Sequence, residues 1–118
     1  AEMCERYGAI THRWNVEWGQ PASLDAFREQ LQTHPNVRAV YTQACETSTA
    51  TVHPVQQMAQ AVRELTPSAL FCVDAITAAG CMELPMDEWQ LDVVCAGSQK
   101  AFMIPTGLSF IALSERAW

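Results

Sequence analysis

The sequence predicts a three-layer α/β/α fold built on a mostly parallel sheet with one antiparallel edge strand. The first observation is that extended apolar runs alternate with segments of helical periodicity, which is typical of strand–helix–strand units. The second is that several apolar runs are continuous rather than alternating, as in strands with both faces buried. The third is that polar side chains follow three of these runs, where parallel sheets carry their functional residues.

The first half of the chain contains two segments with helical spacing. Residues 2–9 have the pattern of a helix end that stops at a glycine, and residues 10–18 alternate apolar and polar side chains like a strand. Ser23 is a suitable N-cap for a helix predicted to end by Thr33, ahead of His34 and Pro35. Another helix is predicted to begin at Pro54 and to end before the TPS sequence.

Four segments are predicted to form one contiguous sheet. They are residues 37–43, 69–75, 92–98 and 109–114. The second and third have the continuous apolar character of buried strands, and residues 109–114 resemble them and are expected antiparallel at one edge. Ser114 is expected to cap a helix that the chain does not complete.

Composition narrows the class of protein. The chain has 118 residues, 49% of them hydrophobic and 17% charged, which fits one globular domain over residues 1–118. The net charge of −6 argues against a nucleic-acid partner. No apolar run is long enough for a bilayer and no signal-peptide pattern is present, so no membrane partner and a cytoplasmic location are predicted. Five cysteines without a CxxC pair predict reduced, mostly buried thiols, and the three histidines fit no zinc spacing, so no metal is expected.

Lys100 is the only lysine, and it closes a predicted buried strand. A lysine amine avoids burial unless it is paired or its pKa is depressed, and a depressed pKa makes it a nucleophile toward carbonyls. The simpler interpretation is a lysine that reaches solvent. The role of Asp74, at the end of the preceding strand, is equally undecided, because such an aspartate can cap a turn or bind a metal or a ribose. Together the amine and the carboxylate fit pyridoxal phosphate, whose aldehyde takes a lysine and whose ring nitrogen takes a carboxylate.

Two stretches carry a resemblance to a known family. VDAITAAG at residues 73–80 and DEWQLDVVCAGSQKAFMIPTGLSFIALSERAW at residues 87–118 resemble the lysine region of class V, fold type I, pyridoxal-phosphate-dependent aminotransferases. The similarity is to the serine/alanine:glyoxylate aminotransferase group, which includes cyanobacterial members labelled soluble hydrogenase subunit. It covers the whole chain, with VEW, ETST and HPV upstream in the family's order.

The resemblance implies a role for each of five residues. Lys100 would form the Schiff base with pyridoxal 5'-phosphate and later move a proton between substrate and cofactor. Asp74 would pair with the pyridinium nitrogen, and Ile76 would pack on one face of the ring. Gln99 would donate to the phosphate, and Thr47 would bond near the phenolic oxygen. Without the family context, Ile76 reads equally well as core, and Thr47 as a helix or turn cap.

The chain also departs from the family's pattern. Ala44-Cys45 replaces His-Gly before the ETST stretch, Ala50 replaces the glycine after it, and Pro105-Thr106 replaces two prolines. Family members are much longer, so the chain resembles a central, incomplete part of the large cofactor-binding domain. No residue matches the family's glycine-rich phosphate cradle, the aromatic residue that stacks on the ring or the arginine that pairs with the substrate carboxylate.

Two functions of different classes follow. The parent protein would be an aminotransferase that transfers the amino group of a small amino acid such as serine or alanine to a keto acid such as glyoxylate. The parent is expected to be a homodimer. The isolated chain is expected to be inactive, and to be oligomeric, rearranged or observed beside the remainder of its protein. The alternative is a noncatalytic, truncated or association module of the same fold. A third hypothesis, a nucleotide-binding domain, has no motif to support it, because neither GxGxxG nor GxxxxGK[ST] is present.

Overall fold

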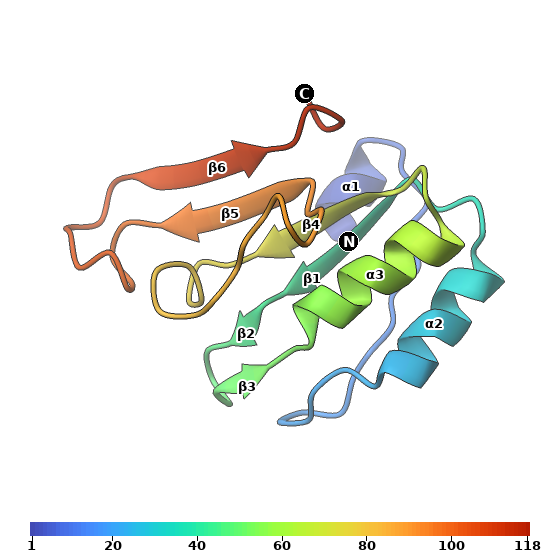
Figure 1. The fold of residues 1–118 in the computed structure, drawn as a ribbon, viewed down its shortest axis with the longest axis horizontal. Helices are drawn as coiled ribbons and strands as arrows, with labels where there is room; N and C mark the ends of the chain where they lie inside the picture. The colour runs from blue at the N-terminus through green and yellow to red at the C-terminus, as the bar shows by residue number, and fades with distance from the viewer.

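The computed structural model describes all residues, 1–118, and centres on a four-stranded sheet (Figure 1). The strand order is β1-β4-β5-β6. These strands are β1 (Ala39–Gln43), β4 (Leu70–Asp74), β5 (Val93–Gly97) and β6 (Ser109–Leu113). β1, β4 and β5 run parallel and β6 is antiparallel to β5, which confirms the predicted sheet and its antiparallel edge.

Two helices cover one face of the sheet, and they pack against each other. They are α2 (Leu24–Thr33) and α3 (Val55–Leu65). α2 begins as predicted, because the Ser23 side chain accepts a hydrogen bond from the N–H of Ala26 at 3.4 Å. The short helix α1 (Glu2–Arg6) lies behind the sheet, drawn paler in Figure 1. None of the helices is long and apolar enough to cross a bilayer.

The main hydrophobic core lies between these two helices and the sheet. Phe71 and Val73 of β4 point toward the helices and are almost fully buried. The side of α3 that faces them carries Met58, Ala59 and Val62, which are also buried. This matches the helical spacing of the apolar residues in the sequence, and burial of such side chains is the main force that holds the helices on the sheet.

The sequence pattern did not reveal a small hairpin after β1. It consists of β2 (Cys45–Glu46) and β3 (Thr51–Val52), joined by a turn over residues 47–50. Ala50 closes this turn with a φ of 53°, in the left-handed region that disfavours side chains. The glycine that the resembled family has at this position would adopt this conformation without that cost.

The predicted strand over residues 10–18 is wrong. These residues join no sheet, although Trp14 and Val16 pack against the core and the Trp14 ring lies 6.0 Å from that of Phe27. Only these two side chains of the alternating set touch the core, since Ile10 is 89% exposed. A strand also needs a neighbour that accepts and donates its backbone hydrogen bonds, and this segment has none.

Three other expectations are corrected near the surface. All five residues of β6 are exposed, although the run resembles a buried strand. Ser114 caps no helix, since its hydroxyl donates to the Asp92 carboxylate and only a turn follows. The cysteines are free as expected, but only Cys72 is buried, and Cys81 is exposed. Burial raises the pKa of the Cys72 thiol to about 11, so it stays protonated at neutral pH.

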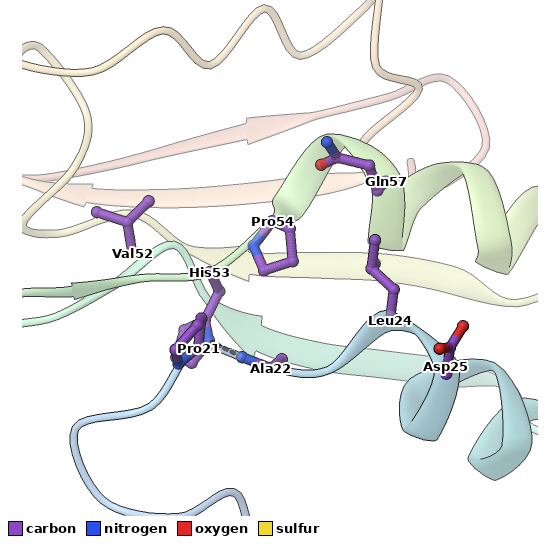
Figure 2. A pocket seen from close by; sticks show the side chains of 8 residues that line it. All are labelled: Pro21, Ala22, Leu24, Asp25, Val52, His53, Pro54 and Gln57. Carbon is purple, nitrogen blue, oxygen red and sulfur yellow. Dashed lines mark hydrogen bonds between the residues drawn. The ribbon is translucent and has the colours of Figure 1, made fainter.

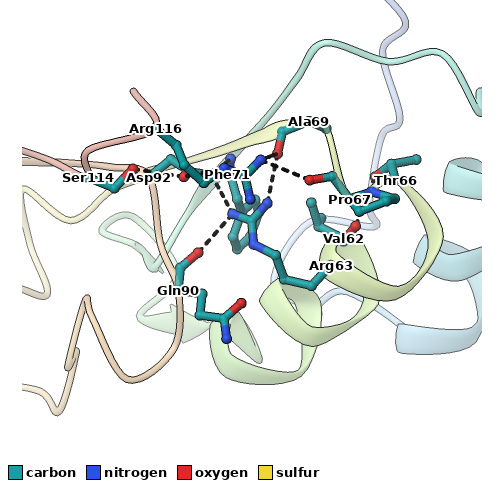
Figure 3. Close-up of polar contacts among 10 residues, drawn as sticks. All are labelled: Val62, Arg63, Thr66, Pro67, Ala69, Phe71, Gln90, Asp92, Ser114 and Arg116. Carbon is teal, nitrogen blue, oxygen red and sulfur yellow. Dashed lines mark hydrogen bonds and ion pairs between the residues drawn. The ribbon is translucent and has the colours of Figure 1, made fainter. Parts of the chain in front are cut away.

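A buried carboxylate joins the elements at the amino end of β5 (Figure 3). The side chain of Asp92 is almost completely buried. It accepts hydrogen bonds from the N–H of Phe71 at 2.7 Å, from the Ser114 hydroxyl at 2.9 Å and from the Arg63 guanidinium. Arg63 also donates to the carbonyls of Ala69 and Gln90, both at 2.8 Å. The cluster thus ties α3 to the ends of three strands.

The ionised form of Asp92 is favoured despite its burial. Burial by itself raises the pKa of a carboxyl group, but the Phe71 N–H, the Ser114 hydroxyl and the Arg63 guanidinium outweigh it and bring the pKa of Asp92 below its ordinary value. A carboxylate with a lowered folded-state pKa stabilises the fold above its unfolded pKa of about 3.9. That contribution is lost as the pH falls through the folded-state pKa.

We expect Asp92→Asn to lower the free energy of unfolding by roughly 3 kcal/mol at pH 7, because it leaves the Arg63 charge uncompensated in a mostly buried site. The difference from the parent chain shrinks as the pH falls below the unfolded-state pKa of about 3.9, because the unfolded chain then binds a proton that the folded carboxylate resists. Urea unfolding at pH 7 and pH 3.5 measures both effects. The matched control is Glu64→Gln, which breaks the exposed Arg28–Glu64 pair at 2.8 Å and costs less than about 1 kcal/mol. Equal losses for the two variants contradict this account.

A second prediction concerns the turn of the hairpin. Ala50→Gly removes the steric cost of a left-handed alanine, about 1–2 kcal/mol, and adds an unfolded-state entropy cost of about 0.5–1 kcal/mol. The net expectation is a gain of roughly 0.5 kcal/mol in the free energy of unfolding, measured by urea titration. Ala26→Gly, inside α2, is the control and destabilises by about 1 kcal/mol. A loss of stability in Ala50→Gly contradicts the prediction.

Candidate active site

The carboxyl ends of the parallel strands meet at the edge of the sheet opposite Asp92. Asp74 is the last residue of β4 and pairs in register with Cys95, two residues before β5 ends at Gly97. The chain then turns through Gln99 and Lys100, which are both exposed. The parallel pairing of β4 with β5 therefore puts the aspartate and the lysine turn at one edge, as the sequence predicts.

Asp74 organises the loop that follows β4. Its Oδ1 accepts a hydrogen bond from the N–H of Ile76 at 3.0 Å, the side chain-to-backbone contact that aspartate often makes two residues on. Its Oδ2 makes no hydrogen bond within the chain. Ile76 is left 37% exposed. The exposed Ile76 and Asp74 thus offer an apolar surface and a negative charge side by side.

Gly97 lets two of the predicted site residues approach each other. A Cβ at this position would lie 3.0 Å from Oε1 of Gln99 and 3.5 Å from Cγ2 of Ile76. The Gln99 amide thus folds back over the end of β5, next to Ile76. Gly97 is not among the site residues predicted from the sequence. The sequence does place a glycine between a predicted buried strand and the SQK turn. It does not show which side chains occupy the space that a Cβ at this position would fill.

Ser98 anchors the turn that carries Lys100. Ser98 is fully buried, and its hydroxyl donates to the carbonyl of Pro105 at 2.7 Å. The backbone N–H of Ser98 donates to the carbonyl of Leu108 at 3.2 Å. The backbone carbonyl of Ser98 accepts a hydrogen bond from the N–H of Ile104 at 3.3 Å. The Lys100 amine makes no hydrogen bond or ion pair within the chain. The buried, hydrogen-bonded Ser98 therefore anchors the turn, and the amine of Lys100, two residues later, remains exposed and without a partner in the chain.

Thr47 reaches the same region from the hairpin. Its Oγ1 lies 2.6 Å from Oγ1 of Thr77, in the loop after β4. Next to it, Glu46 accepts hydrogen bonds from the hydroxyl and the backbone N–H of Ser48, which lower the pKa of that carboxyl. Thr77 was not among the residues predicted from the sequence. The hydroxyl pair connects the hairpin to the loop that contains Asp74 and Ile76.

The side chains at this edge fit the ring portion of pyridoxal phosphate better than they fit a metal. They offer a primary amine, a carboxylate with one free oxygen, an exposed apolar side chain and hydroxyl and amide donors. The close approach of Ile76 and Gln99 over Gly97 shapes this surface. By contrast, no group of three or more His, Cys, Asp or Glu side chains is placed to hold a metal ion.

A separate open hollow of about 580 Å³ lies between the start of α2 and the start of α3 (Figure 2). Its residues are Pro21, Ala22, Leu24, Asp25, Val52, His53, Pro54 and Gln57. The N–H of Ala22 donates to Nδ1 of His53 at 3.1 Å, which ties the two elements together there. None of the five predicted site residues lines this hollow, and its reactive groups are few. The strand-end chemistry, rather than this concavity, marks the candidate site.

Comparison with known proteins finds a family model and relatives that match nearly the whole chain. The family model for aminotransferase class-V matches residues 1–118. The small subunit of a soluble hydrogenase from Synechococcus sp. (strain PCC 6716) is 41% identical over 99% of this chain. An uncharacterized aminotransferase from Helicobacter pylori (strain J99) is 42% identical over 96% of it. The chain spans only 31% and 32% of the length of these two relatives.

The fold is similar as well. The crystal structure of an alanine–glyoxylate aminotransferase from Nostoc sp. superposes with a TM-score of 0.89 at 31% identity, covering 98% of this chain and 30% of that one. Its sheet and the present one are therefore built in the same way over this region. Since the family model extends over every residue of the chain, the chain belongs to the class V aminotransferase family.

Proposed function

We propose that the polypeptide carrying residues 1–118 is a pyridoxal-phosphate-dependent aminotransferase, of which this chain is a part. The proposed reaction moves the amino group of a small amino acid, such as serine or alanine, to a keto acid such as glyoxylate. The observation that carries the proposal is that parallel pairing of β4 with β5 puts Asp74 and the Lys100 turn at one edge of the sheet. The name of the Nostoc relative, which includes alanine and glyoxylate, supports the choice of substrates.

We propose a role for each of the five residues predicted from the sequence. When bound, the cofactor supplies a ring that accepts electrons from the substrate carbon. The Lys100 amine, which is free of internal partners, would attach the cofactor and then carry a proton at the reacting carbon. Asp74 would hold the ring nitrogen through Oδ2, and Ile76 would pack on the ring. Gln99 would donate its amide to the phosphate, and Thr47 would bond near the phenolic oxygen of the ring.

The alternative is a noncatalytic module of the same fold. The chain spans about a third of the length of these relatives. In the proposed enzyme, the phosphate cradle and the group that holds the substrate carboxylate come from other parts of the polypeptide. The two hypotheses differ in whether Lys100 reacts with the cofactor.

We expect pyridoxal phosphate to attach to Lys100 in the full-length polypeptide that carries this chain. Borohydride reduction fixes the cofactor to the lysine, and peptide mass mapping then locates it. Because Lys100 is the only lysine of residues 1–118, a labelled lysine within this range can only be Lys100. A visible absorbance band accompanies the label. We expect the isolated 118-residue chain to form little of either, because the phosphate cradle of the proposed enzyme comes from other parts of the polypeptide.

Lys100→Arg is the matched control. It keeps the positive charge in the same exposed turn but has no primary amine that attaches to an aldehyde. The band and the label should both disappear, while circular dichroism stays unchanged. A full-length protein without the label at Lys100, with the same pyridoxal phosphate affinity in Lys100→Arg, overturns the enzyme proposal in favour of the noncatalytic module.

A further inference from the structure

The short contact between Thr47 and Thr77 joins two segments that are far apart in the sequence. Their Oγ1 atoms lie 2.6 Å apart across 30 sequence positions, which is a good length for a hydroxyl–hydroxyl hydrogen bond. Thr47 lies in the turn of the β2–β3 hairpin, and Thr77 lies three residues beyond Asp74. The contact is the only side-chain hydrogen bond that either hydroxyl makes.

One hydrogen bond between two hydroxyls leaves one proton unused. If Thr47 donates, its proton is spent inside the chain and it offers only lone pairs to a ligand. If Thr77 donates, the proton of Thr47 is free to point outward, and the bond it receives polarises it as a donor. An electron-rich oxygen near Thr47 selects the second arrangement. The pair can therefore be set in the orientation that a negatively charged ligand oxygen needs.

The position of Thr77 is fixed by the same loop that holds Asp74. The N–H of Ile76, its neighbour, donates to Asp74 Oδ1 at 3.0 Å. The carbonyl of Thr77 also accepts a bond from the Cys81 thiol at 3.2 Å. The Thr77 hydroxyl is thus presented to Thr47 by a loop that is tied at both sides. A hydroxyl in such a loop directs its partner better than one on a freely rotating surface side chain.

We propose that Thr77 is a positioning residue of the cofactor site, which donates to Thr47 so that the Thr47 proton points at the phenolic oxygen of the ring. This inference rests on the proposed function. A donor at that oxygen stabilises the form of the bound cofactor with more negative charge there. Losing it raises the pH at which the lysine-bound cofactor gives up its proton. Thr77 touches neither substrate nor cofactor in this account and acts only through Thr47.

The test uses the full-length polypeptide with pyridoxal phosphate and follows the visible absorbance band across pH. Thr77→Val keeps the shape of the side chain and removes the hydroxyl. The dissociation constant should rise about fivefold, as expected for one hydrogen bond, and the midpoint of the absorbance titration should move up by about half a pH unit. Thr77→Ser keeps the hydroxyl and should restore both values. This rescue separates the hydroxyl from any effect on loop folding.

A double-mutant cycle tests whether Thr77 acts through Thr47. In a Thr47→Val background, Thr77→Val should change neither the affinity nor the midpoint further. Additive effects of the two substitutions overturn the proposal, as does a Thr77→Val protein whose affinity and midpoint match those of the parent. Both of these results leave the proposed function standing. If the parent protein itself forms no absorbance band at Lys100, the proposed function and this inference fail together.

Discussion

The carboxylate of Asp92 is the contact on which the geometry of the site depends most. It is buried at the amino end of β5, where it binds the backbone of β4, the hydroxyl after β6 and an arginine of α3. A strand held at one end and paired along its length cannot slide, so the other end of β5 is fixed relative to β4. A slip of one residue would turn the side chains near Lys100 to the opposite face of the sheet. The charge cluster thus sets the position of a lysine that it never touches.

At the other end of the sheet, the site is organised by hydrogen bonds that the chain makes to itself. Ser98 fixes the lysine turn, Asp74 fixes the loop after β4, and Thr47 meets Thr77. Each of these contacts satisfies a polar group and holds an exposed side chain in place. The amine of Lys100 and Oδ2 of Asp74 remain without partners inside the chain. The division between anchoring groups and free groups is what makes this edge suited to holding a planar, charged molecule.

Much of the fold could be predicted because its signals are local or follow from chain topology. Ser23 and Pro54 mark the helix starts, and the continuous apolar runs mark β4 and β5. The prediction of a strand around Trp14 was wrong, since an alternating pattern does not show whether a pairing partner is present. The site was predicted only in part. Asp74 ends β4 and Lys100 lies in the turn after β5, and the sequence shows both positions. The contacts of Gly97, Ser98 and Thr77 involve residues distant in sequence or folded back by a turn, which the sequence does not show.

The exposure of β6 affects how the isolated chain behaves in concentrated solution. Its sequence, SFIAL, has no charge and no proline, all five residues are exposed, and only one of its edges is paired. Such an edge is a template for backbone pairing with another molecule. The net charge of −6 opposes that encounter through long-range repulsion. Added salt removes the repulsion and leaves the strand edge unchanged, so the colloidal stability of this chain falls as ionic strength rises.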